Sequence, residues 1–311
     1  MVVARSIMMV RPVAFRHNEQ TAVNNKFQQP EKTPVNVQQL ALEQFDNFVS
    51  LLQANGITVH TFDDTLQPTT PDSIFPNNWV TFHEDGTAIL YPMYAPNRRT
   101  EKRVDILQEL RNQYMLNTVI DFGYFEASNK FLEGTGSMVL DRLNRIAYMC
   151  ASQRSSNEVF QSFCQKMDYI PITFEALDEN GFPIYHTNVM MCIGTKFAIM
   201  HSASIHDANE RLTVMRTIRQ SGKEIISISN KQLHRFAGNM LELTNKSGQN
   251  LLVMSEQAYL SLNSEQIACL EKYAKLIYAP LDVIEKNGGG SARCMIAEIL
   301  LPIKNDIAVR H

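Results

Sequence analysis

The feature that most constrains the fold of this 311-residue chain is a repeated unit of strand-like and helical patterns. Amphipathic helical periodicity occurs five times, in stretches that begin near residues 38, 100, 155, 206 and 264. These starts recur at intervals of roughly 50–60 residues, a spacing that indicates internal repeats. A single strand-like run follows each helical stretch; the five runs read ITVHTF, NTVIDF, IPITF, EIISIS and KLIYAP.

Pairs of apolar runs precede the second and later helical stretches and are typical of β-hairpins. Turn-forming residues join the two runs of each pair, at Glu84–Gly86, Leu143–Asn144, Gly194–Thr195 and Lys246–Gly248. The fifth pair can only be built from the late run CMIAEILLP and the early run SIMMVRP, so we expect the two ends of the chain to meet.

The repeats predict an α/β fold made of five strand–strand–helix–strand units. With the terminal strands paired, the units form a closed five-bladed α/β propeller, which leaves no sheet edge exposed. We expect one catalytic domain that spans residues 1–311. Ser155 and Ser264 are the predicted N-caps of their helices, since Glu158 follows Ser155 at the capping-box spacing and Glu265 follows Ser264 directly.

Composition excludes several classes of function. The net charge of −3 argues against a surface for nucleic acid or anionic lipid, and no apolar run approaches the roughly 18 residues of a membrane span. Five cysteines without CxxC spacing fit a reducing compartment and give no zinc signature. We therefore expect a cytoplasmic protein without a signal peptide, metal or organic cofactor.

Polar side chains stand just before the first strand of successive hairpins. If the five units surround one axis, these segments converge at one end, and a thiol, an imidazole, a carboxylate and amides meet in one cavity. The residues at the five positions are Asn78, Glu133, His186, Asn239 and Cys294, and Asn188 follows His186 by two residues.

Each of these residues also has a purely structural interpretation. Cysteine is among the most buried residue types, so Cys294 alone could be a packing residue; its place in the repeat favours catalysis. His186 alone reads more simply as a histidine at a strand end. Asn239 could equally fix a turn, and Arg293 reads as a rim or salt-bridge residue.

At these positions the sequence resembles the guanidino-group modifying (amidinotransferase and arginine deiminase-like, or pentein) superfamily. Four segments carry the resemblance: FPNN at 75–78, LEG at 132–134, HTN at 186–188 and GGGSARC at 288–294. The chain is most similar to the bacterial citrulline-utilisation hydrolase, or amidinotransferase-like, branch. The resemblance implies a five-bladed propeller with a Cys–His–Glu centre.

Two departures from the family pattern bear on the substrate. Asn78 and Asn188 occupy positions where deiminases carry aspartates that bind a guanidinium cation. A ureido group is neutral and has a carbonyl oxygen, to which an amide can donate a hydrogen bond. This favours citrulline, hydrolysed to ornithine, ammonia and carbon dioxide through an adduct on Cys294.

The resemblance assigns roles to the remaining residues. His186 is the expected acid and base, and Glu133 is expected to hold the plane of the substrate. For the α-amino-acid end, the sequence offers the segment around Asn24 or the arginines Arg98 and Arg154. The expected substrate-binding residues are Asn78, Asn188, Asn239, Asn25 and Phe27.

Several alternatives stay open at this point. Arginine deiminase, succinylarginine-dihydrolase-like and amidinotransferase activities use the same centre. A Cys–His peptidase or amidase would not need Glu133, and a non-catalytic propeller binding protein would need none of the three catalytic candidates. We expect a small amino-acid substrate and no nucleic-acid or membrane partner, and the sequence is compatible with a homodimer.

Overall fold

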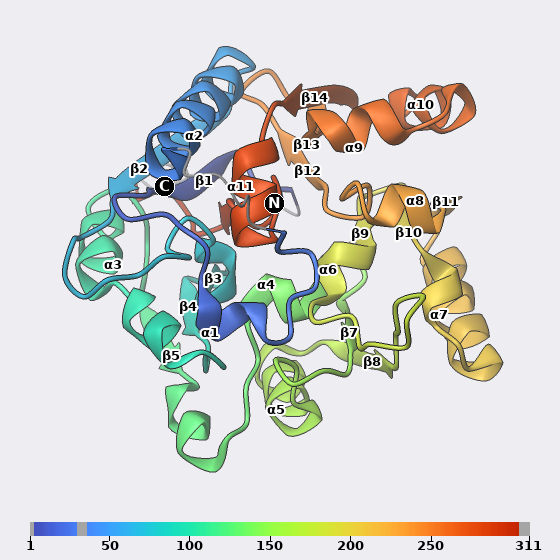
Figure 1. Ribbon diagram of the computed structural model, residues 1–311, viewed down its shortest axis with the longest axis horizontal. Coiled ribbons are helices and arrows are strands. Elements are labelled where there is room, and N and C mark those ends of the chain that lie inside the picture. The colour runs from blue at the N-terminus through green and yellow to red at the C-terminus, as the bar shows by residue number, and fades with distance from the viewer. Residues whose placement is uncertain (1–2, 30–35, 305–311) are drawn as a thin grey trace, which may run out of the picture.

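The computed structural model describes residues 3–29 and 36–304, and its strands form five three-stranded sheets. In each sheet the middle strand pairs antiparallel with one neighbour and parallel with the other. Figure 1 shows the sheets set around a common centre. The strands are β1 (Ser6–Arg11), β2 (Thr58–Asp63), β3 (Val80–Phe82), β4 (Thr87–Leu90), β5 (Thr118–Asp121), β6 (Met138–Asp141), β7 (Ile146–Cys150), β8 (Ile170–Phe174), β9 (Met191–Ile193), β10 (Phe197–Met200), β11 (Glu224–Ser227), β12 (Leu241–Thr244), β13 (Asn250–Ser255), β14 (Lys275–Ala279) and β15 (Ala297–Ile299).

The two ends of the described chain share one sheet, in the order β15-β1-β2. β1 pairs antiparallel with β15, with Ile7 opposite Glu298, and parallel with β2. The expected meeting of the chain ends is therefore confirmed. The other four sheets are each built from three consecutive strands, as the strand–strand–helix–strand pattern predicts.

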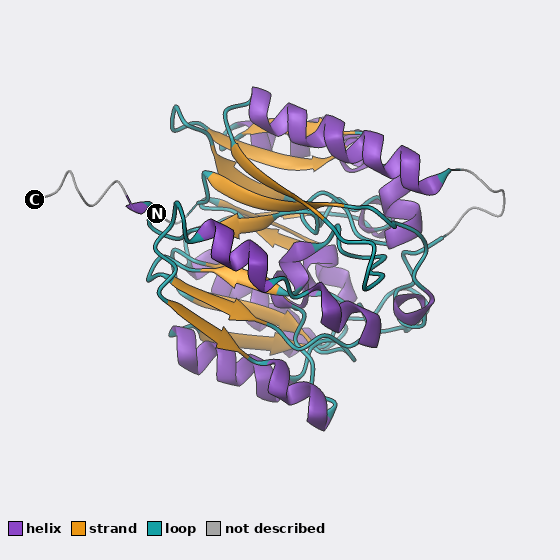
Figure 2. Cartoon of the chain, turned by 90° about the vertical axis from the view of Figure 1, so that its left-hand side faces the viewer, coloured by secondary structure: helices purple, strands orange, loops and turns teal. Residues whose placement is uncertain are grey.

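Helices connect the second and third strands of each unit and lie on the outside of the molecule (Figures 1 and 2). In α2 the side chains of Phe45, Phe48 and Leu52 are fully buried against the first sheet. Burying each such side chain contributes about 1.5–3 kcal/mol, which is why the amphipathic pattern predicts this helix. The helices are α1 (Glu19–Ala22), α2 (Val37–Ala54), α3 (Val104–Leu110), α4 (Gly134–Ser137), α5 (Asn157–Met167), α6 (Thr187–Met190), α7 (Ala208–Gln220), α8 (Asn230–Leu233), α9 (Glu256–Ser261), α10 (Ser264–Glu271) and α11 (Asp282–Gly288).

Both predicted N-caps were wrong by one residue. Ser156, not Ser155, precedes α5, and its side chain makes no capping hydrogen bond. Asn263, not Ser264, caps α10, and it forms a reciprocal capping box with Gln266. Asparagine ranks with serine as a capping residue, so residue preference alone does not choose between neighbours.

Single-turn helices lead into the inner strands of the sheets. The 3-10 turn η1 (Pro76–Asn78) precedes β3, α4 precedes β6 and α6 precedes β9. A further turn over residues 292–295 precedes β15. Asn78, Asn188 and Cys294 lie in these turns, and Glu133 and His186 are the N-caps of α4 and α6. The remaining 3-10 turns are η2 (Pro96–Glu101), η3 (Gly123–Ser128) and η4 (Ser202–Ser204).

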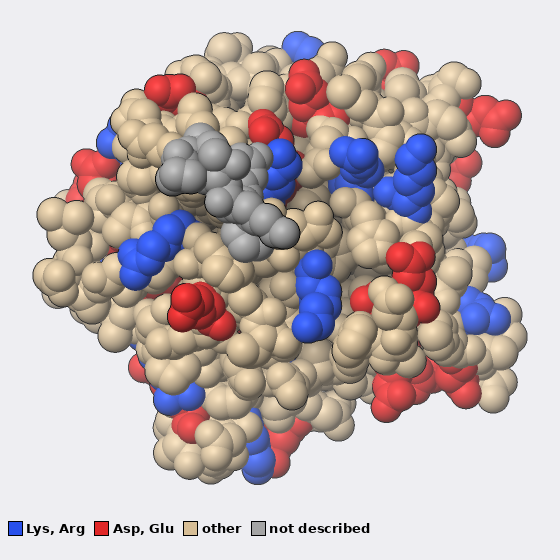
Figure 3. All heavy atoms as spheres, in the orientation of Figure 1, with Lys and Arg blue, Asp and Glu red and all other residues tan. Residues whose placement is uncertain are grey.

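The outer surface carries both signs of charge. On the face shown in Figure 3, lysine and arginine side chains are interspersed with aspartate and glutamate side chains. Among the described residues, no helix has both the length and the apolar character needed to cross a membrane.

Candidate active site

Cys294 lies in the turn that follows the glycine-rich loop, and its backbone N–H donates to the carbonyl of Ser291 over 2.9 Å. The loop needs its glycines where it passes the N-terminal segment. Gly289 has φ +66°, and a Cβ there would lie 2.5 Å from Nδ2 of Asn25. The loop therefore approaches its neighbours more closely than a residue with a side chain could.

Two amides donate hydrogen bonds to the sulfur of Cys294. Nδ2 of Asn239 lies 3.3 Å from it and Nδ2 of Asn188 lies 3.4 Å from it. Oδ1 of Asn239 in turn accepts a hydrogen bond from the backbone N–H of Arg293 over 3.1 Å, which fixes the amide orientation. Donors aimed at sulfur stabilise the negative charge of a thiolate, the reactive form of cysteine.

His186 and Glu133 form a buried pair, with Nε2 of His186 2.8 Å from Oε2 of Glu133. Burial alone would raise the pKa of the Glu133 carboxyl, but Arg154, His186 and Arg98 together lower it well below its usual range. Burial lowers the pKa of His186 to about 4, against the opposing effect of Glu133. An ionised Glu133 keeps the proton on Nε2, so Nδ1 of the neutral imidazole is free to accept one.

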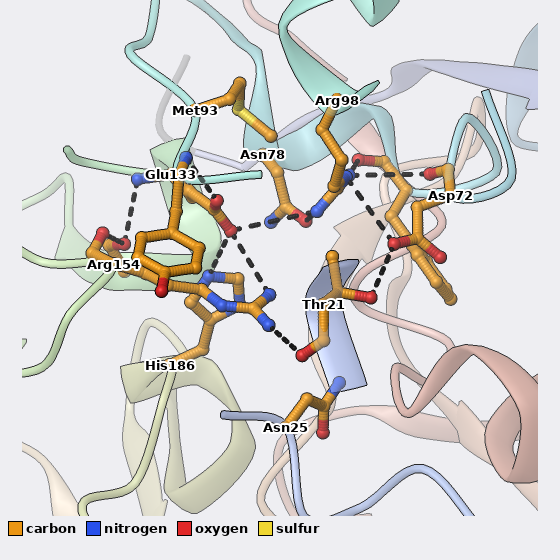
Figure 4. A network of polar contacts seen from close by, with 12 residues as sticks. Thr21, Asn25, Asp72, Asn78, Met93, Arg98, Glu133, Arg154 and His186 are labelled. Carbon is orange, nitrogen blue, oxygen red and sulfur yellow. Dashed lines mark hydrogen bonds and ion pairs between the residues drawn. The ribbon is translucent and has the colours of Figure 1, made fainter. Parts of the chain in front are cut away.

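Two buried arginines flank this pair (Figure 4). Nη1 of Arg154 lies 3.5 Å from Oε2 of Glu133, and Nη1 of Arg98 lies 3.7 Å from the same oxygen. Arg98 also binds Glu101 through two hydrogen bonds of 2.9 Å and donates to Oδ1 of Asn78 over 2.9 Å. The carboxylates of Glu101 and Glu133 thus compensate the buried guanidinium charges.

Asp72 is a site residue that the sequence prediction missed. Its Oδ2 accepts hydrogen bonds from Nδ2 of Asn18 over 2.8 Å and from Oγ1 of Thr21 over 3.1 Å. Its Oδ1 is buried and has no hydrogen-bond partner among the described residues. The only signal in the sequence was an acidic residue in the loop that carries Asn78. It did not indicate whether this side chain would point into the site.

The space between these residues is a small cavity of about 250 Å³ of empty volume. Of the predicted residues, Cys294, His186, Asn78 and Asn25 line it, together with Arg98 and Arg154. Glu133 does not line the cavity, but it is hydrogen-bonded to His186, which does. Asn239 also does not line the cavity, but its amide contacts the sulfur of Cys294. The other lining residues are Thr21, Asp72, Phe75, Tyr185, Gly288 and Gly290.

Two predicted substrate-binding residues lie elsewhere. Phe27 packs its ring against Tyr185, His234 and Phe236, outside the residues that line the cavity. Asn188 touches the sulfur but lines a separate cavity.

The N-terminal segment closes the site from the front. Arg154 donates to the carbonyl of Thr21 over 2.7 Å and from Nε to Oδ1 of Asn24 over 2.9 Å, which ties the segment to the site. Nδ2 of Asn25 reaches the carbonyl of Gly289 over 3.3 Å. As a result Cys294 is only 3% exposed. Within the described part of the chain, no three His, Cys, Asp or Glu side chains are grouped to hold a metal ion.

A comparison with models of known protein families shows which family the chain belongs to. The model described as N,N dimethylarginine dimethylhydrolase, eukaryotic, matches residues 11–301. The chain belongs to this family. It is accordingly a hydrolase of non-peptide C–N bonds in the pentein superfamily. No curated protein matches it.

Solved structures of this family's fold are similar over nearly the whole chain. The substrate-bound N-terminal domain of ArgZ, an arginine dihydrolase from cyanobacteria, has a TM-score of 0.74 at 18% identity, covering 96% of this chain and 98% of that one. A dimethylarginine dimethylaminohydrolase adduct has a TM-score of 0.64 at 16% identity, covering 95% and 100%. The chain spans only 42% of full-length ArgZ. At these identities the likeness establishes the pentein-like α/β fold.

Proposed function

We propose that this protein is an arginine dihydrolase. Arginine and two waters would give ornithine, two molecules of ammonia and carbon dioxide, through covalent adducts on Cys294. Citrulline, which the sequence predicts as the substrate, becomes the intermediate between the two hydrolytic steps. The arginine dihydrolase ArgZ, including a variant domain covalently bound to a reaction intermediate, supports the proposal as a structural neighbour.

The observation that most supports the proposal is the orientation of the Asn78 amide. Arg98 has only hydrogen-bond donors, and its Nη1 lies 2.9 Å from Oδ1 of Asn78, so the oxygen of this amide faces the arginine. Nδ2 of Asn78 is buried and has no partner within the described residues. A guanidinium offers no acceptor to this N–H group, whereas the oxygen of a ureido group does. The site is therefore suited to hold the product of a first deimination for a second attack.

In the first half-reaction, Cys294 attacks the guanidino carbon. Its thiol proton passes to Nδ1 of His186 and from there to a terminal nitrogen, which leaves as ammonia when the C–N bond breaks. Water then attacks the adduct carbon, His186 takes the water proton, and the C–S bond breaks to return the thiol and citrulline.

The second half-reaction repeats these steps on the ureido carbon. Cys294 attacks it, the δ-nitrogen leaves as the amine of ornithine, and a carbamoyl group remains on sulfur. Hydrolysis gives carbamate, which decomposes to ammonia and carbon dioxide. Throughout, Glu133 holds the imidazole of His186 in the tautomer that leaves Nδ1 unprotonated.

The charged end of the substrate has a complementary group in the cavity. The unpartnered Oδ1 of Asp72 suits the α-ammonium group. Asn25 lies on the same cavity wall and belongs to the proposed binding set, as does Asn239 through its contact with the sulfur.

The finer predictions from the sequence form part of this proposal. They are the closed five-bladed ring, a single catalytic domain over residues 1–311, a cytoplasmic location and kinship with the citrulline-utilisation branch. Residues 1–2, 30–35 and 305–311 of that domain lie outside the described residues. A homodimer is likewise a prediction, and sedimentation velocity of the purified protein tests it.

The decisive experiment compares arginine with citrulline. The wild type is expected to release ornithine and ammonia from both, with isotope-labelled arginine passing through bound citrulline. Asn78→Asp is expected to retain arginine deimination and to lose citrulline hydrolysis, because a carboxylate repels the ureido oxygen. Equal retention of both reactions by Asn78→Asp would refute the role of this amide.

A second candidate is the hydrolysis of dimethylarginine, which the description of the matching family favours. This activity would release dimethylamine and stop at free citrulline. Quantifying dimethylamine and ornithine from parallel incubations separates the two functions.

A further inference from the structure

A second cavity shares no lining residue with the substrate cavity and meets the catalytic centre at Asn188, whose amide donates to the sulfur of Cys294. We call it the far-face cavity; it has about 610 Å³ of empty volume, part of it open to solvent. Its walls come from the inner strands β6, β9, β12 and β15, and Val3 lies at its rim.

The floor of the far-face cavity reaches the catalytic centre. Asn188 lines it while its Nδ2 touches the sulfur of Cys294 at 3.4 Å. Thr135 and Arg293, each close in sequence to a proposed catalytic residue, line it as well. Oδ1 of Asn188 is 99% buried with its residue and has no hydrogen-bond partner among the described residues. One amide group therefore separates the far-face cavity from the nucleophile.

The walls favour small uncharged polar molecules over ions. Each charged side chain that lines the cavity is hydrogen-bonded to a neighbour rather than left free for a ligand. Arg293 lies 2.8 Å from Glu298, and Arg142 lies 3.3 Å from the same carboxylate. Asp141 binds Lys223, and Glu242 accepts hydrogen bonds from Thr195 and Asn250. Because these side chains already have hydrogen-bonding partners, the walls suit water and ammonia, which need only single hydrogen bonds, better than an amino acid zwitterion, which needs two free counter-ions.

The proposed reaction needs a route by which water and ammonia can pass while citrulline stays bound. Each half-reaction consumes water and a small product leaves, while citrulline has to stay bound between them. The front of the site is closed by the N-terminal segment, which Arg154 and Asp72 hold through Thr21. Opening this front to admit water would also release citrulline. A separate entrance for water avoids that loss.

We propose that the far-face cavity conducts water to Cys294 and ammonia away from it, with Oδ1 of Asn188 as the last hydrogen-bond acceptor before the sulfur. This inference rests on the proposed hydrolase function of the site. It predicts that obstruction of the cavity slows hydrolysis of the adduct without slowing its formation, since the substrate enters from the front.

The test obstructs the cavity away from the catalytic residues. Ile193 on β9 lines the far-face cavity and is half-buried, so Ile193→Trp adds bulk to its wall. Ile170 on β8 is 58% exposed and lies outside the lining, so Ile170→Trp is the matched control. A second pair is Leu140→Trp in the lining and Leu212→Trp on the exposed face of α7.

The readout separates the two steps. Rapid mixing with arginine followed by acid quench and mass spectrometry measures adduct on Cys294, and ammonia release measures turnover. We expect the cavity variants to form adduct at the wild-type rate, to turn over about tenfold more slowly, and to accumulate adduct. The control variants should match the wild type in both.

Two results would overturn the conduit. One is wild-type turnover in both cavity variants; the other is equal slowing of adduct formation and hydrolysis, which indicates a general disturbance of the site. Absence of any adduct from arginine or citrulline in the wild type would instead remove the proposed function, and the conduit with it.

Discussion

Gly136 stands between the two groups on which the proposed chemistry depends, and its replacement by alanine has a calculable effect. A Cβ at this position would lie 2.4 Å from Nδ2 of Asn78 and 2.7 Å from Cε1 and Nδ1 of His186, where ordinary contacts are 3.4–4 Å. To lengthen the contact between this Cβ and Nδ2 of Asn78 from 2.4 Å to an ordinary 3.4 Å, the two groups must move apart by about 1 Å. Because a misplacement of this size costs about 10²-fold, Gly136→Ala should lower kcat/KM for arginine by that factor.

The assay is ammonia release under kcat/KM conditions, accompanied by a thermal melt. Gly248→Ala is the control, because Gly248 lies at a hairpin tip with φ +84° and no atom lies within 4 Å of a Cβ there. We expect both variants to melt somewhat below the wild type and only Gly136→Ala to lose activity. A loss of less than about threefold, or an equal loss in Gly248→Ala, would show that Asn78 and His186 are not the positioned pair.

Three further predictions concern the nucleophile, pH and the buried ion pairs. Cys294→Ala should abolish turnover and the mass-detected adduct at an unchanged melting temperature; residual wild-type activity would exclude this nucleophile. Since burial lowers the pKa of His186 to about 4 and the base must be neutral, kcat/KM should persist as pH falls below 6.5 and be lost only near 4. A profile in which kcat/KM already falls near pH 6.5 would contradict the buried environment of His186. Glu298→Gln leaves the buried guanidinium groups of Arg142 and Arg293 without their carboxylate, so urea denaturation should show a loss of about 3–5 kcal/mol in unfolding free energy. A loss below about 1 kcal/mol would mean that these charges are solvated.

The sheets and their order were accessible from sequence because they depend on short-range patterns. Helical periodicity, turn residues and alternating apolar runs each extend over fewer than about 20 residues. Their repetition then placed Cys294, His186 and Asn78 at equivalent positions, and in the structure these residues line one cavity. Family resemblance added roles for them that no local pattern contains.

Side-chain direction was harder to predict, and Asn188 shows why. The family resemblance predicted that Asn188, two residues after His186, would share the substrate cavity with it. His186 is instead the N-cap of the single-turn helix α6, which includes Asn188. His186 itself has an extended backbone, so the chain changes from extended to helical between the two residues, and they line different cavities.

Long-range contacts lay beyond the sequence pattern for a different reason. Asp72 acquires its importance from Asn18 and Thr21, more than 50 positions away. An acid in a polar loop has no periodicity that would mark it as buried. Only the packing of the N-terminal segment over the site reveals it.

The pairing of β1 with β15 has a consequence for biosynthesis. During translation, β1 cannot complete its sheet until residues near 297–299 have been translated, and Cys294 emerges only just before them. Contacts between such distant positions carry a large loop-closure entropy, which slows folding. The nascent polypeptide therefore lacks its nucleophile, and one edge of β1 stays unpaired, until these residues have been translated; during this time the exposed edge is open to a chaperone.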